Sequence, residues 1–572
     1  MKPLIVATTL LIETSPQALP LGAACIASAI KSDPLTQDKF EVKLIPVSKE
    51  EKGYLDAPKE AKIDYIAKML LAQGTPKYVL FSVYVWNHTE LEQVSTLLKK
   101  LHPEIITIAG GPEVTANPTA FNGFDYTVSG AGEIANPLLI SELEKGQINP
   151  ENMVQGVYNP KFLREENPAK CMRAMAPQLD KLSSPYLDGT LDVAEYGGAL
   201  WELARGCPFK CSYCYESKGE KKIQYFPLER IQQELELFNR KKISQVFVLD
   251  PTYNANKKRA AELLNLIAKK APGMFFYFEA RAEFIDRELA RAFTKIPCAL
   301  QFGLQSADPE VLKLVNRTLD KKLFTRNIGY LNETGAIFGF DLIYGLPGDT
   351  LEGFKRSIDF ALNLYPNNLE TFCLSVLPGT DLYEKAKDLG LEWQPEPPYN
   401  VTKTTKFSPK DLQEARKLSL ACNLFYNDGR AVPWFNTIIH GLKMRPSIFL
   451  KEFYDWLLKN HPQYADTQNN SCHELKHLQI EKIQLEFIKY IFTARQKNNL
   501  LLTAQNLIIL NGAFSRVESD GKEQIISLNY YPDDLFSPYA TDIDFFAKNA
   551  QKYSSKYKCF KGKNNIEIKP FK

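Results

Sequence analysis

The sequence predicts an α/β protein with three successive regions, and three observations lead to this prediction. Residues 1–146 alternate strand-like and helix-like stretches, as expected of a doubly wound sheet. Residues 197–395 repeat that alternation six times, as expected of an open (β/α)₆ partial TIM barrel. Residues 396–572 change to longer helical patterns with a short strand pair, which predicts a mainly helical α+β region.

The N-terminal region contains five strand candidates, separated by helical patterns long enough for crossovers between parallel neighbours. These candidates are Pro3–Thr9, Val42–Pro46, Tyr78–Val85, Ile105–Gly110 and Asp125–Ser129. Ligands of such sheets bind at the carboxyl ends of the strands. We therefore expect functional residues at Trp86–Asn87, Gly110–Pro112 and Gly130–Glu133, directly after three of the strands.

Residues 147–196 are rich in Pro, Asn, Ser and Lys, which predicts a linker that wraps a domain surface. Six strand candidates then alternate with helical patterns. They are Ala199–Ala204, Gln245–Leu249, Phe275–Ala280, Ala299–Gln305, Ile337–Tyr344 and Glu370–Val376. A group of three cysteines follows the first of these strands, at the edge where the ligands of a barrel bind.

The C-terminal region predicts three long helices, Pro409–Phe425, Ser447–Asn460 and His473–Ala494. A hairpin is predicted between Asn506–Val517 and Glu523–Tyr531, because an Asp-Gly pair can supply its turn. The Lys-rich tail after residue 552 is predicted to be solvated. This region carries no chemical motif, so we expect it to shape or cover a substrate pocket.

Composition excludes several classes of protein. The chain has 70 Lys and Arg against 67 Asp and Glu, which does not favour nucleic-acid binding and leaves a small molecule or a peptide as substrate. The apolar start Leu4–Ile12 lacks a basic flank, and no apolar run approaches the roughly 18 residues of a membrane span. We therefore expect a cytoplasmic protein. Seven of the ten cysteines are scattered singly, so no disulfide scaffold is expected.

The three clustered cysteines, Cys207, Cys211 and Cys214, form a C-x₃-C-x₂-C loop. Three thiolates on a short loop suit a [4Fe–4S] cluster and leave one iron open for another ligand. The alternative is structural zinc, which needs four ligands that usually come in pairs. Here the pairing is absent and all six histidines lie far away in sequence, so the loop favours the cluster.

The stretch Arg205–Tyr215, with Tyr213 inside the loop, resembles the radical S-adenosylmethionine (SAM) superfamily. This resemblance implies that SAM binds the open iron and that an electron donor such as flavodoxin or ferredoxin reduces the cluster. It further implies SAM contacts from residues at the strand ends: Tyr213, Asp250, Glu279, Arg281, Gln301, Gln305 and Pro378. Each polar residue in this set could instead make a hydrogen bond inside the barrel.

Two doubly wound folds compete for the N-terminal region. A dinucleotide site would show Gly-x-Gly-x-x-Gly after the first strand, and Thr8–Ala23 has no such run. The region instead resembles the Rossmann-like B12-binding domain of cobalamin-dependent radical SAM enzymes. This resemblance implies cobalamin contacts from Ser82, Trp86, Gly110, Gly111, Pro112, Gly130, Gly132 and Glu133.

The lower face of cobalt has no obvious protein ligand, because no histidine occurs before His88. The position of His88 after an Asn in a predicted capping loop favours a surface role for this residue. We hypothesise that Trp86, at the tip of the third strand, covers the lower face of cobalt. The alternative is a tryptophan of the rim or core.

Nearly 400 residues resemble the cobalamin-dependent radical SAM family, many members of which are methyltransferases. The resemblance implies that a 5′-deoxyadenosyl radical removes a substrate hydrogen and that methylcobalamin then supplies a methyl group to carbon. A cyclase or oxidase without net methyl transfer remains an alternative, as does a non-catalytic cobalamin-binding sensor. Methylthiotransferase activity is disfavoured because no second cysteine triplet precedes the barrel.

Overall fold

The structure is a computed structural model that describes residues 2–147, 154–162, 170–218, 222–467, 475–563 and 565–571 of the 572-residue chain. The chain divides into two compact units. Unit 1 comprises Met1–Leu300, Val315–Arg317 and Ser375–Val401, and unit 2 comprises Gln301–Leu314, Thr318–Leu374 and Thr402–Lys572. These units differ from the domains predicted with boundaries at residues 146, 196 and 395, because strands of the predicted barrel belong to both units.

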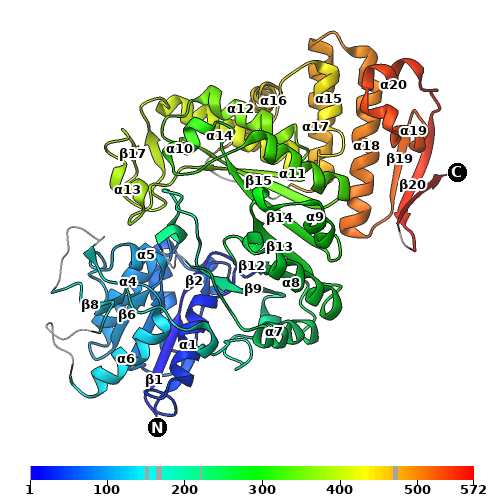
Figure 1. Cartoon of the computed structure of the whole chain (residues 1–572). Helices are drawn as coiled ribbons and strands as arrows, with labels where there is room; N and C mark the ends of the chain where they lie inside the picture. The colour runs from blue at the N-terminus through cyan, green and yellow to red at the C-terminus, as the bar shows by residue number, and fades with distance from the viewer. Residues whose placement is uncertain are drawn as a thin grey trace. The chain divides into compact units, whose positions relative to one another are not determined.

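Unit 1 begins with a six-stranded sheet of order β3-β1-β5-β6-β7-β8, drawn in blue to cyan in Figure 1. The strands are β1 (Leu4–Thr8), β3 (Glu41–Leu44), β5 (Tyr78–Ser82), β6 (Ile106–Gly110), β7 (Tyr126–Val128) and β8 (Val157–Tyr158). All neighbours are parallel except β7 and β8. This order places the topological switch point between β1 and β5, where ligands of doubly wound sheets bind.

Helices cover both faces of this sheet. Residues of α1 (Leu21–Ser32) and α6 (Gly132–Glu144) share one apolar core with the strands. Residues of α3 (Lys62–Leu71) and α4 (His88–Leu101) share the other. The doubly wound fold predicted for this region is therefore confirmed.

The segment after α6 lies along this domain wherever the structure describes it. Ala174 N donates to Ser129 O at 2.7 Å, and Ser28 Oγ donates to Asp188 Oδ2 at 2.5 Å. The predicted linker, residues 147–196, also includes residues 148–153 and 163–169, which lie outside the described residues.

The second sheet has the order β9-β12-β13-β14-β15-β16, as predicted for six β/α repeats. Its strands are β9 (Gly198–Trp201), β12 (Gln245–Val248), β13 (Phe275–Ala280), β14 (Cys298–Gln305), β15 (Ile337–Tyr344) and β16 (Asn368–Cys373). Its helices are α7 (Leu228–Arg240), α8 (Lys257–Lys270), α9 (Arg287–Phe293), α11 (Lys321–Thr334) and α12 (Leu351–Leu362). In unit 1, β12 pairs in parallel with β9 and β13; in unit 2, β15 pairs in parallel with β16.

Several of these helices begin at a residue whose side chain accepts a backbone N–H bond. Asn256, Asp286 and Asp320 cap α8, α9 and α11 in this way. α11 ends at Gly335, whose φ of +72° is a left-handed conformation that glycine adopts without strain. Such local signals explain why the β/α alternation could be predicted from the sequence.

The C-terminal part of unit 2 consists of helices and one small sheet. The helices are α14 (Pro409–Cys422), a π-helix (Asn423–Asn427), α15 (Phe435–Leu442), α16 (Pro446–Asn460), α17 (His477–Ala494), α18 (Asn498–Asp520) and α20 (Ile543–Asn549). Strands β19 (Gln524–Leu528), β20 (Ser555–Lys561) and β21 (Ile566–Pro570) form an antiparallel sheet. The predicted start of the third long helix, residues 473 and 474, lies outside the described residues.

Two sequence predictions for this region are wrong. Asn506–Val517 is not a hairpin strand but part of α18, and Gly521 caps that helix with a φ of +65°. The apolar run around Leu507 fits a buried strand as well as a buried helix, and the Asp-Gly pair serves as a helix end instead of a hairpin turn. The tail after residue 552 is not wholly solvated, since β20 and β21 form there and Cys559 is fully buried.

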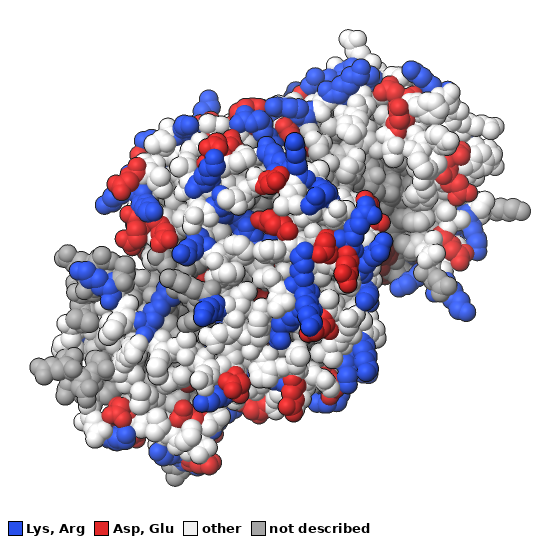
Figure 2. Space-filling model, viewed as in Figure 1, with Lys and Arg blue, Asp and Glu red and all other residues white. Residues whose placement is uncertain are grey.

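Among the described residues, α18 is the one helix long and apolar enough to cross a membrane by length and composition. However, 61% of its most apolar window is buried within the protein. α18 therefore has the character of a core helix. Figure 2 shows basic and acidic side chains interspersed over the visible face, which fits the near-balance of 70 against 67 charged residues.

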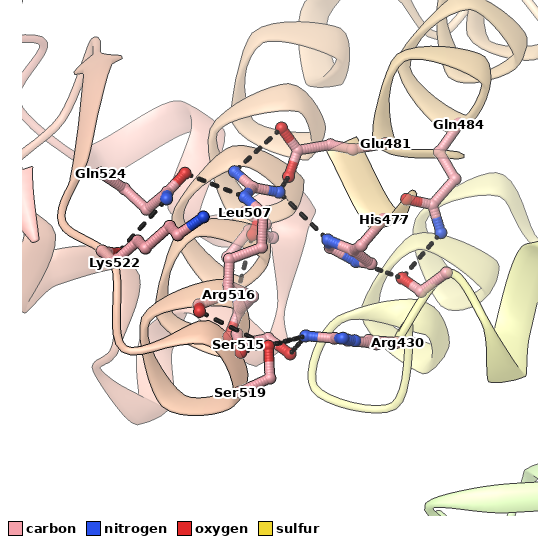
Figure 3. Close-up of polar contacts among 12 residues, drawn as sticks. Arg430, His477, Glu481, Gln484, Leu507, Ser515, Arg516, Ser519, Lys522 and Gln524 are labelled. Atoms are coloured by element: carbon pink, nitrogen blue, oxygen red, sulfur yellow. Dashed lines mark hydrogen bonds and ion pairs between the residues drawn. The ribbon is translucent and has the colours of Figure 1, made fainter. Parts of the chain in front are cut away.

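A buried polar network joins α17 to α18 (Figure 3). Arg516 Nη1 donates to Glu481 Oε2 at 2.5 Å and lies 3.1 Å from His477 Nδ1. Burial lowers the pKa of His477 to about 4, and Arg430 and Arg516 add to this shift. The ring is therefore neutral near pH 7, so Nδ1 can accept from Arg516 while Nε2 donates to Gly429 O.

Candidate functional site

The cysteine loop begins just after the first barrel strand. It lies between the short paired strands β10 (Ala204–Arg205) and β11 (Gln224–Tyr225). Its three cysteines are free thiols; Cys211 is buried, and Cys207 and Cys214 are half-buried. Across the described residues, no three His, Cys, Asp or Glu side chains converge on a single metal ion. A cluster binds each thiolate through a different iron, so the loop fits [4Fe–4S] better than zinc.

Contacts from distant parts of the sequence hold this loop. Ser212 N donates to Val315 O at 3.0 Å, and Leu382 N donates to Ser212 O at 2.8 Å. Asn316 Nδ2 donates to Lys210 O at 2.6 Å. The loop conformation therefore depends on the two short segments, near residues 315 and 382, that fold back into unit 1.

Arg317 contacts a loop cysteine, although it is not among the site residues predicted from the sequence. Its Nη1 donates to Cys211 Sγ at 3.7 Å and to Tyr213 OH at 3.2 Å. Burial raises the pKa of Tyr213, although Arg317 opposes this shift, so the phenol stays protonated. A cation and an N–H donor beside a thiolate stabilise negative charge on its sulfur. Arg317 carries no local sequence signal, because it lies beyond the short helix α10 (Pro309–Leu314) that follows β14.

Asp250 lies just beyond β12, as predicted, and is buried. Its Oδ1 accepts hydrogen bonds from Leu203 N and Ala204 N, both at 2.9 Å. These contacts fix the backbone immediately before the cysteine loop. A contact with the amino group of SAM stays a prediction.

We expect Asp250→Asn to change how stability depends on pH. Burial raises the pKa of Asp250 to about 7, although the Leu203 and Ala204 N–H groups oppose this shift. The folded state therefore holds a proton that the unfolded state releases near pH 4, so wild-type stability falls as pH rises from about 4 to about 7. The amide keeps an acceptor oxygen and carries no charge.

Thermal unfolding followed between pH 4 and 8 checks this expectation. The variant should gain stability relative to the wild type as pH rises from about 4 to about 7, and the gain should level off above about pH 7. A pH-independent difference would show that Asp250 does not titrate in this range.

Glu279 and Arg281 lie together at the end of β13. Arg281 pairs with Glu283 at 2.6 Å, and its guanidinium lies 3.8 Å from the ring centroid of Phe209 in the cysteine loop. Glu279 is exposed to solvent, yet burial by the surrounding protein raises its pKa and Glu216 adds to the shift. Such a carboxyl is accessible and could accept hydrogen bonds from the hydroxyl groups of a ligand.

The remaining predicted SAM residues are divided between the units. In unit 2, Gln301 Nε2 donates to Asp341 Oδ1 at 2.7 Å. Gln305 has a φ of +65°, and its Oε1 is buried without a hydrogen-bond partner among the described residues. In unit 1, Pro378 precedes Gly379, whose Cβ would lie 3.4 Å from the Tyr215 ring. The structure thus gathers some predicted residues around the loop and leaves Gln301 and Gln305 in the other unit.

A cavity of about 700 Å³ opens at the switch point of the first sheet in unit 1. The eight residues predicted there all line it: Ser82, Trp86, Gly110, Gly111, Pro112, Gly130, Gly132 and Glu133. Gly111 has a φ of +110°, and a Cβ at this position would lie 2.5 Å from Val83 O. The glycine turn therefore excludes side chains and keeps backbone at the cavity wall, as a bulky ligand requires.

Trp86 forms part of the rim of this cavity. It is 44% exposed, and its ring stacks on Tyr84 with centroids 4.5 Å apart and planes 6° apart. The position of Trp86 is therefore fixed from one side while the indole stays accessible. It is a rim tryptophan and not a core one.

Glu133 forms an ion pair with a residue beside the cysteine loop, and the sequence alone did not predict this contact. Arg205 Nη1 lies 2.8 Å from Glu133 Oε1, while Arg205 Nε lies 2.8 Å from Glu202 Oε1. Burial disfavours the charge on Arg205, but the two carboxylates raise its pKa. The guanidinium thus bridges the first sheet region and the start of the loop within unit 1.

A second cavity, of about 610 Å³, lies next to the first. Glu202 and Arg205 line both cavities, and Tyr215 and Glu216 from the cysteine loop line the second. The Glu216 side chain is accessible to solvent at the wall of this cavity. The surrounding protein nevertheless separates its carboxyl from bulk water, which raises its pKa, and the nearby Glu202 carboxylate adds to the shift. Two adjoining spaces therefore lead from the glycine turns to the cysteine loop.

Two family models match consecutive parts of the chain. The B12 binding domain matches residues 8–140, and the Radical SAM superfamily matches residues 201–361. The first match covers the doubly wound sheet with its cavity, and the second covers the cysteine loop and most of the following repeats.

Two curated relatives each match about two thirds of the chain. The cobalamin-dependent radical SAM methyltransferase TokK of Streptomyces tokunonensis is 28% identical over 415 residues, which are 66% of this chain and 57% of TokK. The 2-(S-pantetheinyl)-carbapenam-3-carboxylate methyltransferase of Streptantibioticus cattleyicolor is 27% identical over 396 residues, covering 64% of this chain and 56% of that protein. The chain thus spans little more than half the length of these relatives.

Solved structures share the fold. The cobalamin-dependent SAM radical enzyme OxsB, with aqua-cobalamin bound, superposes with a TM-score of 0.58 at 15% identity, covering 96% of this chain and 85% of OxsB. The methyltransferase TsrM from Kitasatospora setae reaches a TM-score of 0.55 at 16% identity, covering 70% and 80%. With both family models matched in this order, the chain belongs to the cobalamin-dependent radical SAM enzyme family.

Proposed function

We propose that this protein is a radical SAM methyltransferase that uses cobalamin to methylate an unactivated carbon of a small molecule or peptide. The observation that carries the proposal is the pair of adjoining cavities in unit 1. One is walled by the glycine turns of the B12-binding region, the other by the cysteine loop, and Glu202 and Arg205 border both. A substrate radical that takes a methyl group from cobalamin requires the two cofactor sites to adjoin, because the radical must meet the methyl donor before it is lost.

Each cofactor has a set of residues that suits it. Cys207, Cys211 and Cys214 would hold the cluster, whose open iron takes SAM. Glu279, with its accessible carboxyl, would bind the ribose hydroxyls of SAM. The glycine turns after β6 and β7 would let cobalamin approach the backbone. When bound, these cofactors supply a 5′-deoxyadenosyl radical and a transferable methyl group.

The protein's own contribution is to position and shield. Arg317 keeps a positive charge and an N–H donor at Cys211. Asp250 fixes the backbone just before the reactive loop, and Asn316 fixes it at Lys210 within the loop. The cavity walls would exclude water once both cofactors are bound, and that water would otherwise compete for a reactive intermediate.

Anaerobic incubation of the reconstituted protein with SAM, a reductant and hydroxocobalamin tests the proposal. We expect 5′-deoxyadenosine from radical formation, and S-adenosylhomocysteine only when cobalamin is present. Formation of 5′-deoxyadenosine without S-adenosylhomocysteine would support a cyclase or oxidase instead. Formation of neither product would support a binding or sensor protein. Metabolite or peptide profiling of a deletion strain for a species lighter by one methyl would then identify the substrate.

We expect Trp86→Ala to change the absorption spectrum of bound cobalamin. The residue lines the cavity rim, so its indole would lie against the lower face of cobalt and keep water from coordinating there. Truncation would admit water and shift the spectrum toward that of the water-ligated cofactor. Tyr84→Phe, which keeps an aromatic ring beneath Trp86, is the control and should leave the spectrum unchanged. A Trp86→Ala spectrum identical to that of the wild type would contradict the role.

An electron donor of the flavodoxin or ferredoxin type would reduce the cluster, and the reaction would take place in the cytoplasm. Support comes from the family's need for a reductant. Pull-down of the reconstituted protein with a flavodoxin, followed by cluster reduction, would test this partner.

A further inference from the structure

Two buried glutamates follow the two glycine turns that wall the first cavity. Glu113 is the second residue of α5 (Pro112–Ala116), directly after the Gly110–Gly111 turn. Glu133 is the second residue of α6, directly after the turn at Gly130. Both carboxylates are at least nine-tenths buried, and each contacts a side chain of unit 1 that lies after residue 196. Glu113 also lies beside His88 of its own domain, whereas the cation that pairs with Glu133 comes from outside that domain.

Glu133 forms an ion pair with Arg205, which lies two residues before Cys207. The Glu133 side chain is 7% exposed and that of Arg205 is 24% exposed, so solvent screens this pair only weakly. Removing one partner of such a pair leaves a charge that is poorly compensated. The turn at Gly130 and the start of the cysteine loop are therefore held in one relative position.

Glu113 is bonded to Tyr399. The Tyr399 hydroxyl donates to Glu113 Oε1, and both side chains are buried. His88 Nδ1 lies 3.4 Å from the same carboxylate oxygen. Burial together with the neighbouring Glu113 raises the pKa of Tyr399, so the phenol remains a donor over the physiological range.

The segment that carries Tyr399 also contacts the cysteine loop. Leu382 N donates to Ser212 O at 2.8 Å. At Gly379, an added Cβ would lie 3.2 Å from Ala116 O in α5 and 3.4 Å from the Tyr215 ring. The backbone at Gly379 thus fits closely between the end of α5 and the cysteine loop, and a side chain there would require its neighbours to shift.

We propose that Glu113 and Glu133 are positioning residues that couple occupancy of the first cavity to the conformation of the cysteine loop. A ligand that presses on either glycine turn shifts the adjoining glutamate, and the bonded barrel residue moves with it. Glu133 is connected to the cysteine loop through Arg205. Glu113 is connected to it through Tyr399 and the segment of residues 375–401. Both glutamates act through their protein partners, since their carboxylates are already engaged. The inference rests on the proposed function in one respect: the ligand of the cavity is cobalamin.

Hydrogen exchange on the full-length protein with a reconstituted cluster tests this coupling, with hydroxocobalamin as the probe. In the wild type, cobalamin should slow exchange at the glycine turns and also in peptides from residues 203–215 and 375–401. We expect slowing of about fivefold or more at these distant peptides, the lower end for coupled sites. In a Glu133→Gln, Tyr399→Phe double variant, measured at hydroxocobalamin concentrations that saturate that variant's own binding, the turns should be protected while protection of the distant peptides is lost.

Glu144→Gln is the matched control. Glu144 lies at the other end of α6 and also bonds a tyrosine hydroxyl and a cation, but its partners Tyr78 and Lys77 belong to the same domain. This variant should keep the wild-type pattern. If Glu133→Gln disturbs folding, Tyr399→Phe alone should still reduce protection, because Tyr399 lies outside the cavity.

The outcomes separate the two proposals. Cobalamin binding with unchanged distant protection in the double variant overturns the coupling and leaves the proposed function intact. A wild type that binds no hydroxocobalamin overturns the proposed function, and the coupling falls with it.

Discussion

Cys211→Ser should abolish reductive cleavage of SAM. Cys211 is the buried member of the three loop thiols, and it contacts Arg317. Mutation of a residue that merely hydrogen-bonds a metal ligand lowers metal affinity by about 10–100-fold. Loss of a ligand itself should lower the affinity by more. We expect the as-reconstituted variant to hold little iron and to form no 5′-deoxyadenosine above background. Iron content, the EPR signal after reduction and product chromatography measure these three quantities.

Cys298→Ser is the matched control for this experiment. Cys298 is also a buried free thiol of unit 1, but it lies at the start of β14 and donates to Phe293 O at 3.4 Å. A serine hydroxyl can keep that hydrogen bond, so iron content and SAM cleavage should match the wild type. If Cys211→Ser still cleaved SAM, the assignment of the loop as a cluster site would be wrong.

Much of the fold and part of the site follow from local sequence signals. Strand and helix periodicity, together with glycines after β6 and β7, predicted the strand-end turns that line the cavity, because turns at strand ends have local signatures. The C-x₃-C-x₂-C spacing identified the loop for the same reason. These features depend on residues within a few positions of one another.

Other parts of the site depend on contacts between distant residues. Arg317 meets Cys211 across 106 positions, and Tyr399 meets Glu113 across 286. Nothing in the local sequence distinguishes these residues from ordinary surface charges or core tyrosines. Asp250 shows the converse: its strand-end position was predicted, but its bonds to Leu203 and Ala204 were not. Strand-end position indicates where a residue lies, while its hydrogen bonds depend on what packs against it.

The error at Asn506–Val517 has a similar cause. A buried apolar segment carries no periodicity, so its length and its flanking residues must decide between helix and strand. Here the segment continues a helix of 23 residues, and buried polar groups such as Arg516 mark the face that packs on α17. Arg516 and Glu481 are 35 positions apart, so only the folded structure reveals that they pair.

Glu481→Ala should destabilise the C-terminal part of unit 2 by about 3–5 kcal/mol, because it leaves the buried Arg516 charge without its carboxylate. The two side chains are 8% and 7% exposed, and the remaining partners of Arg516 are the neutral groups His477 and Gln524. Since a chain of two units need not unfold in one step, hydrogen exchange in α17 and α18 is the appropriate measurement. Exchange there should accelerate while exchange in the first sheet stays unchanged.

Two further variants show whether the unpaired charge is the cause. Replacing Glu481 and Arg516 together by Leu and Met should recover most of the loss, because an apolar pair of similar volume needs no compensation. Glu452→Ala breaks the more exposed pair with Arg495 and should cost no more than about 1 kcal/mol. Equal effects of Glu481→Ala and Glu452→Ala would contradict the explanation, since they would mean that burial of the Figure 3 network adds nothing to its strength.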